Sequence, residues 1–361
     1  MSAPLTQDAG VQEEPPPGQV RVRRAGRASY LGGAVMLLVV LALADAPFQV
    51  SRGVQIQLVQ LFSYVLLGTM WNLLAGYAGM VSVGQQGFIG IGGYGLVYLA
   101  DQVGVSPFLA VPLAALACGV VAWLESFLVF RLVGGYFAIG TWVFAEVLRL
   151  LTTQIEALGA GSGISLMAWS QFTPGYRIAY VYWLSLAGTC LAVLVVYLLM
   201  RSGLGLGLAA VRDDQTAAGT LGVRVTRSKR LVYVVAAIGC GLVGGMITSN
   251  TLRVQPDSIY SVNYSAVMIF IVIIGGIGTI EGPILGAVLF FLLEQQLSDL
   301  GSWYLVILGA LAIAITLFLP QGLWGLIGRG RLRLFPVGYT LREPPPDPTR
   351  SVREATRSAD A

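Results

Sequence analysis

The stretch AAVRDDQTAAGTLGVRVTRSKRL occupies residues 209–231 and interrupts a sequence otherwise rich in Leu, Val, Gly, Ala and Ile. It carries five cationic residues and two aspartates. The segments on either side, 178–200 and 231–252, are long and apolar enough to enter a bilayer. A polar stretch between two such segments has to lie outside the lipid. Its apolar neighbours therefore decide the fold, which is one of membrane-spanning helices joined by loops.

The whole chain has the composition of a membrane protein. Of its 361 residues, 56% are hydrophobic and 11% are charged, whereas about a quarter of the residues in ordinary globular proteins are charged. Each crossing of the hydrocarbon core takes about 20 residues in a helix, which satisfies its own backbone polar groups. We therefore predict an all-α polytopic membrane protein with about eight to ten transmembrane helices, some of them short or broken.

Ten apolar segments supply these predicted helices. Those at 84–100 and 283–297 are short or rich in glycine, and broken or re-entrant spans are open alternatives for them. The spacing of Gly282 and Gly286, like that of Gly241 and Gly245, allows helices in lipid to pack closely. The ten segments are 30–48, 54–75, 84–100, 106–130, 135–155, 178–200, 231–252, 264–280, 283–297 and 303–320.

Cationic residues fix the predicted orientation, because they collect in loops on the cytoplasmic side. With the N-terminus inside, 18 of the 22 arginines and lysines face the cytoplasm, and only three face outward. We therefore predict that both termini and the loop at 201–230 are cytoplasmic. The expected organisation is a disordered tail at 1–29, a transmembrane domain at 30–328 whose two halves this loop joins, and a second cytoplasmic tail at 329–361.

Missing residue types exclude several classes of function. The chain contains no histidine, which excludes a Ser-His dyad and a His-ligated zinc site. Its single lysine, Lys229, lies outside any P-loop pattern, so this chain is not itself a P-loop ATPase. Cys118, Cys190 and Cys240 lie in separate apolar segments, as small core residues do. We expect no enzymatic activity, no cofactor and no metal site.

The polar loop has the pattern of a short capped helix. Asp213 and Asp214 suit a helix N-terminus, and Gly222 suits the left-handed position after its end. A helix this short needs a packing partner to be stable, and small side chains suit insertion into a groove of another protein. An ordinary basic loop that attracts anionic lipid is the alternative, and the pattern alone leaves both open. The residues at helical spacing inside the loop are Ala217, Ala218 and Leu221.

A second candidate region is NLLAGYAGMVSVGQQGFIGIGGYG, residues 72–95. Its GxGxxG pattern is not a dinucleotide fingerprint, because a membrane span precedes it instead of a strand. Repeated glycines permit a break that exposes backbone to a transport pathway, and the segment at 274–287 has the same character. Close helix packing is the alternative. The candidate pathway residues of this region are Asn72, Gln85, Gln86, Gly90 and Gly92.

The predicted helix at 135–155 carries two ionisable residues at membrane depth. Glu146 and Arg149 are three residues apart and so share one helix face. Such residues are costly in lipid and normally face the protein interior or a pathway. A structural pair within the helix and a pathway role are both compatible with this spacing. Tyr136 and Thr141 on the same helix complete the set of candidate pathway residues.

Four stretches of the chain, in order, resemble the membrane permease subunits of branched-chain amino-acid ABC importers, the LivM type. The third is the most specific, because AAGTLG at 217–222 resembles part of the loop by which importer permeases dock onto their ATPases. The stretches are NLLAGYAGMVSVGQQGFIGIGGYG; RLVGGYFAIGTWVFAEVLRLLT (131–152) with GAGSGISL (159–166); residues 201–237; and IGGIGTIEGPILGAVL (274–289) with LFLPQGLWGLI (317–327).

The resemblance implies a coupling site and a set of partners. The partners are two cytoplasmic ABC ATPases, a second homologous permease and an extracytoplasmic solute-binding protein, at a bacterial inner membrane and without nucleic acid. The solute would be a branched-chain or other small amino acid. An ion-coupled secondary transporter, which also has broken helices and buried carboxylates, is the alternative from another class. The implied ATPase-coupling residues are Arg212, Asp213, Asp214, Thr216, Ala217, Ala218, Leu221 and Gly222.

Two positions depart from the family pattern. Gln85 follows Val83 and Gly84 where the family commonly has Leu-Gly-His, and Thr216 stands where the docking loop usually has a glutamate. Gln85 keeps hydrogen-bonding capacity but does not titrate near neutral pH. Related permeases carry urea or short amides, so the identity of the solute stays open, as does the choice between a homodimeric and a heterodimeric pore.

Overall fold

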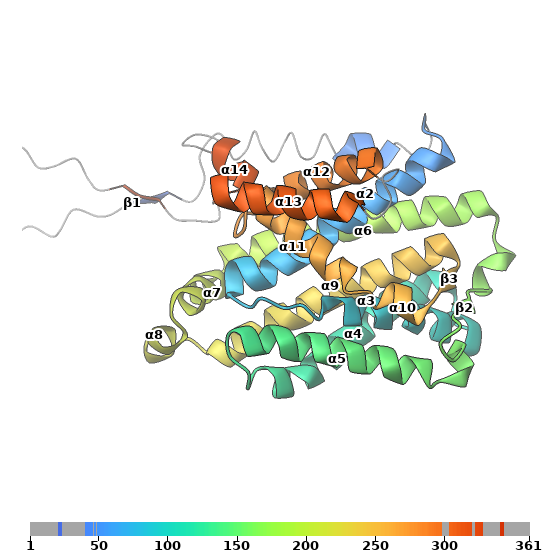
Figure 1. Ribbon diagram of the computed structural model, residues 1–361, viewed down its shortest axis with the longest axis horizontal. Coiled ribbons are helices and arrows are strands. Elements are labelled where there is room, and N and C mark those ends of the chain that lie inside the picture. Colours follow the sequence, from blue (N-terminus) through green and yellow to red (C-terminus); the bar gives the residue numbers. More distant parts are fainter. Residues whose placement is uncertain are drawn as a thin grey trace, which may run out of the picture.

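The computed structural model describes residues 21–23, 40–45, 47, 49–297, 303–319, 322–327 and 340–342. Within these residues it is a bundle of helices that run side by side along the long axis of Figure 1. The predicted all-α architecture is confirmed. Most of the predicted span 30–48 and of both tails lies outside the described residues. The strands form two small antiparallel pairs, β1 (Arg21–Arg23) with β4 (Thr340–Arg342) and β2 (Ile164–Ser165) with β3 (Arg253–Val254).

The helices follow the predicted segments closely. The first half contains α2 (Arg52–Asn72) continued by the π-helical η1 (Leu73–Tyr77), α3 (Gln85–Val97) continued by the π-helical η2 (Tyr98–Gln102), α4 (Pro107–Val129), α5 (Gly135–Thr153), the short η3 (Glu156–Leu158) and η4 (Ala168–Gln171), and α6 (Pro174–Arg201). The second half contains α7 (Gly203–Asp213), α8 (Gln215–Thr220), α9 (Val225–Thr251), α10 (Pro256–Ile259), α11 (Asn263–Gly275), α12 (Glu281–Leu297), α13 (Trp303–Phe318) and α14 (Gly322–Ile327).

Six helical segments of the described chain are long and apolar enough to cross a membrane. The weak predicted segments 84–100 and 283–297 are α3 and α12, and each is short but unbroken. The chain is interrupted elsewhere, at the turn between α10 and α11 and at the Gly-rich turn 276–280 between α11 and α12. The six segments are Arg52–Tyr77, Pro107–Val129, Pro174–Arg201, Val225–Thr251, Pro256–Gly275 and Val306–Gly325.

Helix α3 lies in the interior, enclosed by α4, α5 and α9. Its glycines bring backbones together: Gly92 faces the carbonyl of Gly241 on α9 so closely that any side chain there would overlap it. Gly95 faces Ala114 of α4, and Gly87 faces Ala145 of α5. Small residues thus let four helices approach closely, which stabilises helix association in lipid.

Glycines also join α11 to α12. A side chain at Gly275 would overlap the carbonyl of Gly282, and one at Gly286 would overlap the carbonyl of Ile271. These contacts are the close helix packing that the spacing of Gly282 and Gly286 allows. The two helices form a tight hairpin whose turn is the segment 276–280.

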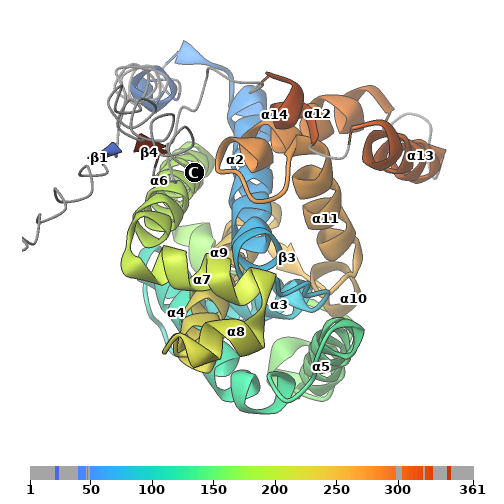
Figure 2. The ribbon, with the colours of Figure 1, turned by 90° about the vertical axis from the view of Figure 1, so that its left-hand side faces the viewer.

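The loop predicted at 201–230 contains more structure than expected. Helix α7 was not predicted; it begins after Ser202, whose hydroxyl accepts a hydrogen bond from the backbone nitrogen of Leu204 at 3.2 Å. It packs on the bundle through a buried face made of Gly205, Leu208 and Val211. Figure 2, which looks onto this end of the molecule, shows α7 and α8 lying across the ends of the long helices.

Candidate functional site

Helix α8 has the capped structure that the sequence predicts. The Asp214 carboxylate accepts hydrogen bonds from the backbone nitrogens of Thr216 at 2.7 Å and Ala217 at 3.0 Å. These bonds from Ala217 and Thr216 lower the pKa of Asp214 from its usual value. Gly222 follows the helix with a φ of +84°, the left-handed conformation that ends helices. The other predicted cap residue, Asp213, is the last residue of α7 instead.

Most of α8 faces away from the bundle. Ala218 is its buried residue, with 1% of its surface exposed. Thr216 and Ala217 are exposed, and Leu221 just beyond the helix is 80% exposed. Figure 1 shows α8 projecting from one end of the molecule beyond α7. The helix therefore presents small side chains and one large apolar side chain to whatever lies beyond this end.

Arg212 is exposed, like most of the predicted coupling set, but it also contacts a distant part of the chain. Its Nη1 donates a hydrogen bond to the carbonyl of Gly76 in η1, with an N–O distance of 2.6 Å. The guanidinium thus contacts the membrane-spanning part of the same chain. Sequence reasoning had no means of pairing two residues 136 positions apart.

Asn72 is also held by backbone groups of a distant segment. Its Oδ1 accepts from the backbone nitrogen of Gly278 at 2.8 Å, and its Nδ2 donates to the carbonyl of Thr279 at 2.7 Å. The residue is 1% exposed. In this structure Asn72 joins the end of α2 to the turn between α11 and α12.

Gln85, Gln86 and Thr141 form one buried polar group at the start of α3. Gln85 donates from Nε2 to the hydroxyl of Ser82 at 3.1 Å, and Gln86 accepts a hydrogen bond from the hydroxyl of Ser265 on α11. The Thr141 hydroxyl, on α5, accepts from the backbone nitrogen of Val83 at 3.2 Å. These three candidate pathway residues therefore lie together, enclosed by the helices in this single chain.

Gly90 and Gly92 lie deeper along α3 and are packed against neighbours. A side chain at Gly90 would overlap the ring of Tyr260, and one at Gly92 would overlap the backbone of Gly241. Their geometry is that of close helix packing, which was the alternative to a pathway role in the sequence.

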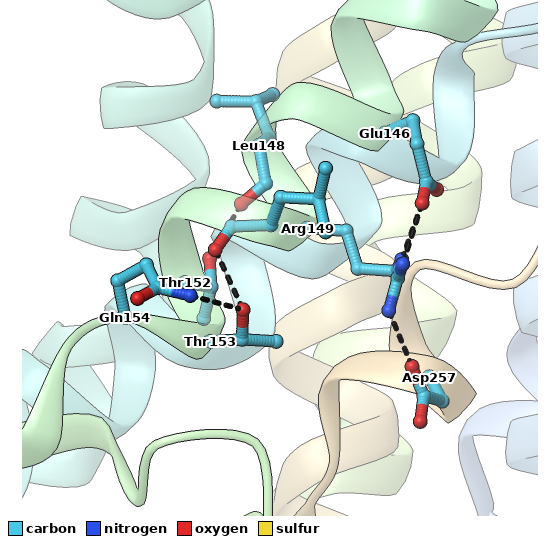
Figure 3. Close-up of polar contacts among 8 residues, drawn as sticks. Glu146, Leu148, Arg149, Thr152, Thr153, Gln154 and Asp257 are labelled. Atoms are coloured by element: carbon cyan, nitrogen blue, oxygen red, sulfur yellow. Dashed lines mark hydrogen bonds and ion pairs between the residues drawn. The ribbon is translucent and has the colours of Figure 1, made fainter.

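Two charged side chains of α5 meet a third from α10, as Figure 3 shows. Arg149 lies between two carboxylates: its Nη2 is 2.5 Å from Oε1 of Glu146, and its Nη1 is 2.5 Å from Oδ1 of Asp257 on α10. The predicted pair of Glu146 and Arg149 is confirmed. Asp257 was not among the residues predicted from the sequence, because it lies 108 residues from Arg149 along the chain. Its position as an acidic residue shortly after the predicted span 231–252 was an indication in the sequence.

This charged group lies on an open face of α5. The side chains of Arg149 and Glu146 are 24% and 45% exposed, and that of Asp257 is 84% exposed. Tyr136, another predicted pathway residue, is 75% exposed nearer the other end of the helix. The opposite face, with Phe137, is buried against the bundle. The same uncovered surface also carries exposed apolar side chains, among them Ile139, Val143 and Leu150, so its polar groups are Tyr136 at one end and the charged residues near the other.

The end of the molecule opposite α8 carries an open pocket of about 930 Å³, lined by residues of 100–107 and 163–172. Asp101 fixes its wall by accepting hydrogen bonds from the backbone nitrogens of Met167 at 2.9 Å and Ala168 at 2.7 Å. Strand β2, whose residues Ile164 and Ser165 line the pocket, lies at the end of the bundle opposite α8 (Figure 1).

Comparison with known proteins shows similarity along most of the chain. Residues 54–316 match the family model described as branched-chain amino acid transport system / permease component. The chain is 30% identical over 315 residues to the high-affinity branched-chain amino acid transport system permease protein LivM of Salmonella typhimurium, which covers 80% of this chain and 74% of the relative. LivM of Escherichia coli is 29% identical over 316 residues, with the same two coverages.

A shorter similarity reaches a sugar permease. The ribose import permease protein RbsC of Bacillus subtilis is 27% identical over 135 residues, or 36% of this chain and 42% of the relative. No solved structure matches the chain. All these relatives are named as transport permeases.

Proposed function

Because the chain belongs to the family of permease components of branched-chain amino acid transport systems, we propose that it forms half of the membrane pathway of an ABC importer for branched-chain or other small amino acids. Separate ATPase subunits drive the transport, because this chain has no P-loop. The observation that carries this proposal is α8, a capped helix that projects from one end of the bundle with Leu221 exposed.

The proposed contact surface for the ATPase consists of Thr216, Ala217, Leu221 and Gly222. A helix of six residues is not stable in water by itself, so its cap at Asp214 and its buried Ala218 hold it in place. Exposed small residues around one large apolar side chain suit a groove in a partner. Two ATPase subunits, a second permease and a solute-binding protein complete the proposed importer.

The proposed pathway runs along the open face of α5. Ionisable side chains are costly next to lipid tails, so the face with Glu146 and Arg149 suits a wall shared with the second permease. A zwitterionic amino acid carries both charges that this group can pair. Gln85, Gln86 and Thr141 lie on the inner side of the same wall, where they position α3 against α5.

The proposed orientation places α8 in the cytoplasm and the 930 Å³ pocket outside. The cationic residues support this choice, because six of them lie between 201 and 230. The outer pocket then lies where a solute-binding protein delivers its cargo.

The test is to measure binding of the ATPase subunits to the permease complex in proteoliposomes, together with uptake of radiolabelled leucine. Leu221→Asp is expected to weaken ATPase binding about tenfold or more, because it puts a charge into an apolar groove. Val133→Asp is the matched control, since Val133 is 74% exposed and lies in the loop between α4 and α5. It should leave ATPase binding unchanged.

Two outcomes contradict the proposal. Equal ATPase binding by the Leu221→Asp variant and the unmodified complex would remove α8 as the docking surface. Leucine uptake by this chain alone, driven by an ion gradient without ATP, would assign the chain to ion-coupled transporters instead.

A further inference from the structure

Arg212 lies near the end of α7, which packs on the bundle, just before the projecting helix α8. It is the penultimate residue of α7 and lies two positions before Asp214, which caps α8. Its guanidinium donates to the carbonyl of Gly76, in the π-helical end of α2. Free carbonyls at a helix C-terminus carry partial negative charge and favour a cation. The side chain therefore ties the base of α8 to the end of a membrane-spanning helix.

The same guanidinium lies against the turn between α11 and α12. An added Cβ at Gly278 would be 2.9 Å from Nη1 of Arg212, so the two groups are in contact distance. Gly278 has a φ of +76°, which a residue with a side chain rarely adopts. Asn72 binds the backbone nitrogen of Gly278 at 2.8 Å and so holds the turn against η1. Arg212 thus contacts η1 in the first half of the chain and the turn between α11 and α12 in the second half.

The turn 276–280 is joined to α11 and α12 by hydrogen bonds and close contacts. The Thr279 hydroxyl donates to the carbonyl of Gly276 at 2.8 Å and accepts from the backbone nitrogen of Gly282, in the first turn of α12, at 3.0 Å. Gly282 in turn touches α11 through Gly275. A displacement of the turn would therefore be passed to both α11 and α12, because close-packed elements transmit strain.

Resting on the proposed function of α8 as the ATPase contact, we infer that Arg212 is a positioning residue that transmits the movement of α8 to α2 and to the α11–α12 hairpin. It acts inside the chain and does not itself contact the ATPase. The backbone approach this requires is provided by Gly79, where an added Cβ would be 3.4 Å from the Cα of Arg212, with a φ of +67°. The connection between α8 and the bundle thus consists of the Arg212 guanidinium and of glycines, which have no side chain to exclude it.

The test uses the assembled importer in proteoliposomes and measures leucine moved per ATP hydrolysed, together with ATPase binding. Arg212→Met keeps most of the side-chain length and removes the donors. It is expected to bind the ATPases normally but to move about fivefold less leucine per ATP, the lower end of coupling between linked sites. Arg212→Lys, which keeps one cationic donor, should fall between this variant and the unmodified protein. Arg227→Met, at an exposed arginine of the same cytoplasmic segment, is the matched control and should change neither quantity.

Each result has a defined meaning. Unchanged leucine per ATP in Arg212→Met overturns the inference, and so does a loss of ATPase binding that accounts for the lost transport, since Arg212 would then be a docking residue. If Arg212→Met does not accumulate in the membrane, Arg212→Lys decides: an unchanged ratio overturns the inference, and a lowered ratio with normal ATPase binding supports it. Failure of the unmodified complex to couple ATP to uptake would instead refute the proposed function.

Discussion

Replacing Gly92 by alanine tests whether the glycines of α3 serve close packing or a pathway. The added methyl group would overlap the carbonyl oxygen and the α-carbon of Gly241 on α9. Both are backbone atoms of a long buried helix, so no side chain can rotate away and α3 and α9 have to separate. We expect a loss of about 3 kcal/mol in the free energy of unfolding, the upper end of the cost of overpacking a core. This loss exceeds the gain of up to about 1 kcal/mol that alanine brings to a helix.

The assay is thermal unfolding of the purified chain in detergent, with uptake measured in parallel. Gly219→Ala is the matched control, because Gly219 is also helical but no atom lies within 4 Å of an added Cβ. Its Tm should be unchanged or slightly higher, while that of Gly92→Ala should fall by several degrees. A normal Tm with lost uptake would refute the packing argument and favour a pathway role for Gly92.

Three further predictions concern the coupling helix and the charged face. Asp214→Ala should weaken ATPase binding a few-fold, since it removes the cap of α8. The pKa of Asp214 is lowered in the folded chain, so the cap stabilises α8 fully above the usual aspartate pKa, and this stabilisation is lost as the pH falls through the lowered pKa. Arg149→Met should reduce leucine uptake about fivefold or more by leaving Glu146 unpaired beside the proposed pathway, whereas Asp257→Asn should have a smaller effect, because Asp257 is 84% exposed. A cysteine at Leu221, in a chain without its native cysteines and expressed without the ATPase subunits, should react with an impermeant maleimide in inside-out vesicles but not in intact cells, and the reverse would contradict the proposed orientation.

Local patterns were readable in the sequence, and contacts between distant segments were not. The cap of α8 was predicted because Asp214 and Gly222 act within their own turns of helix. Helix α7 was missed because GLGLGL has glycine at every second position, a composition with low helix propensity. Its buried Leu208 and Val211 stabilise it through packing on the bundle, which overrides that propensity.

Pathway candidates were harder to place, because residue type does not reveal which face of a helix is covered. Asn72 is a plausible pathway amide by chemistry, yet its two amide atoms bind the backbone of a turn more than 200 residues away. Gln86 likewise binds Ser265, which belongs to the other half of the chain. Neither contact can be read from the sequence, because each joins residues of the two halves that become neighbours only in the folded chain.

Helices α4 and α5 show why the covered face matters for function. Each is mostly apolar and carries one glutamate, and α5 also carries Arg149. In the structure, Glu125 of α4 is turned inward and is 2% exposed, and the outer face of α4 carries apolar residues such as Leu116 and Val120. Glu146 of α5 is turned outward together with Arg149, and its side chain is 45% exposed. The rest of the outer face of α5 is apolar, with Trp142, Val143 and Leu150 exposed, so the outer sides of α4 and α5 differ mainly in the charged group, which is costly beside lipid. This charged group supports the proposal that a protein or aqueous neighbour lies beside Glu146 and Arg149, as half of a shared pathway would have.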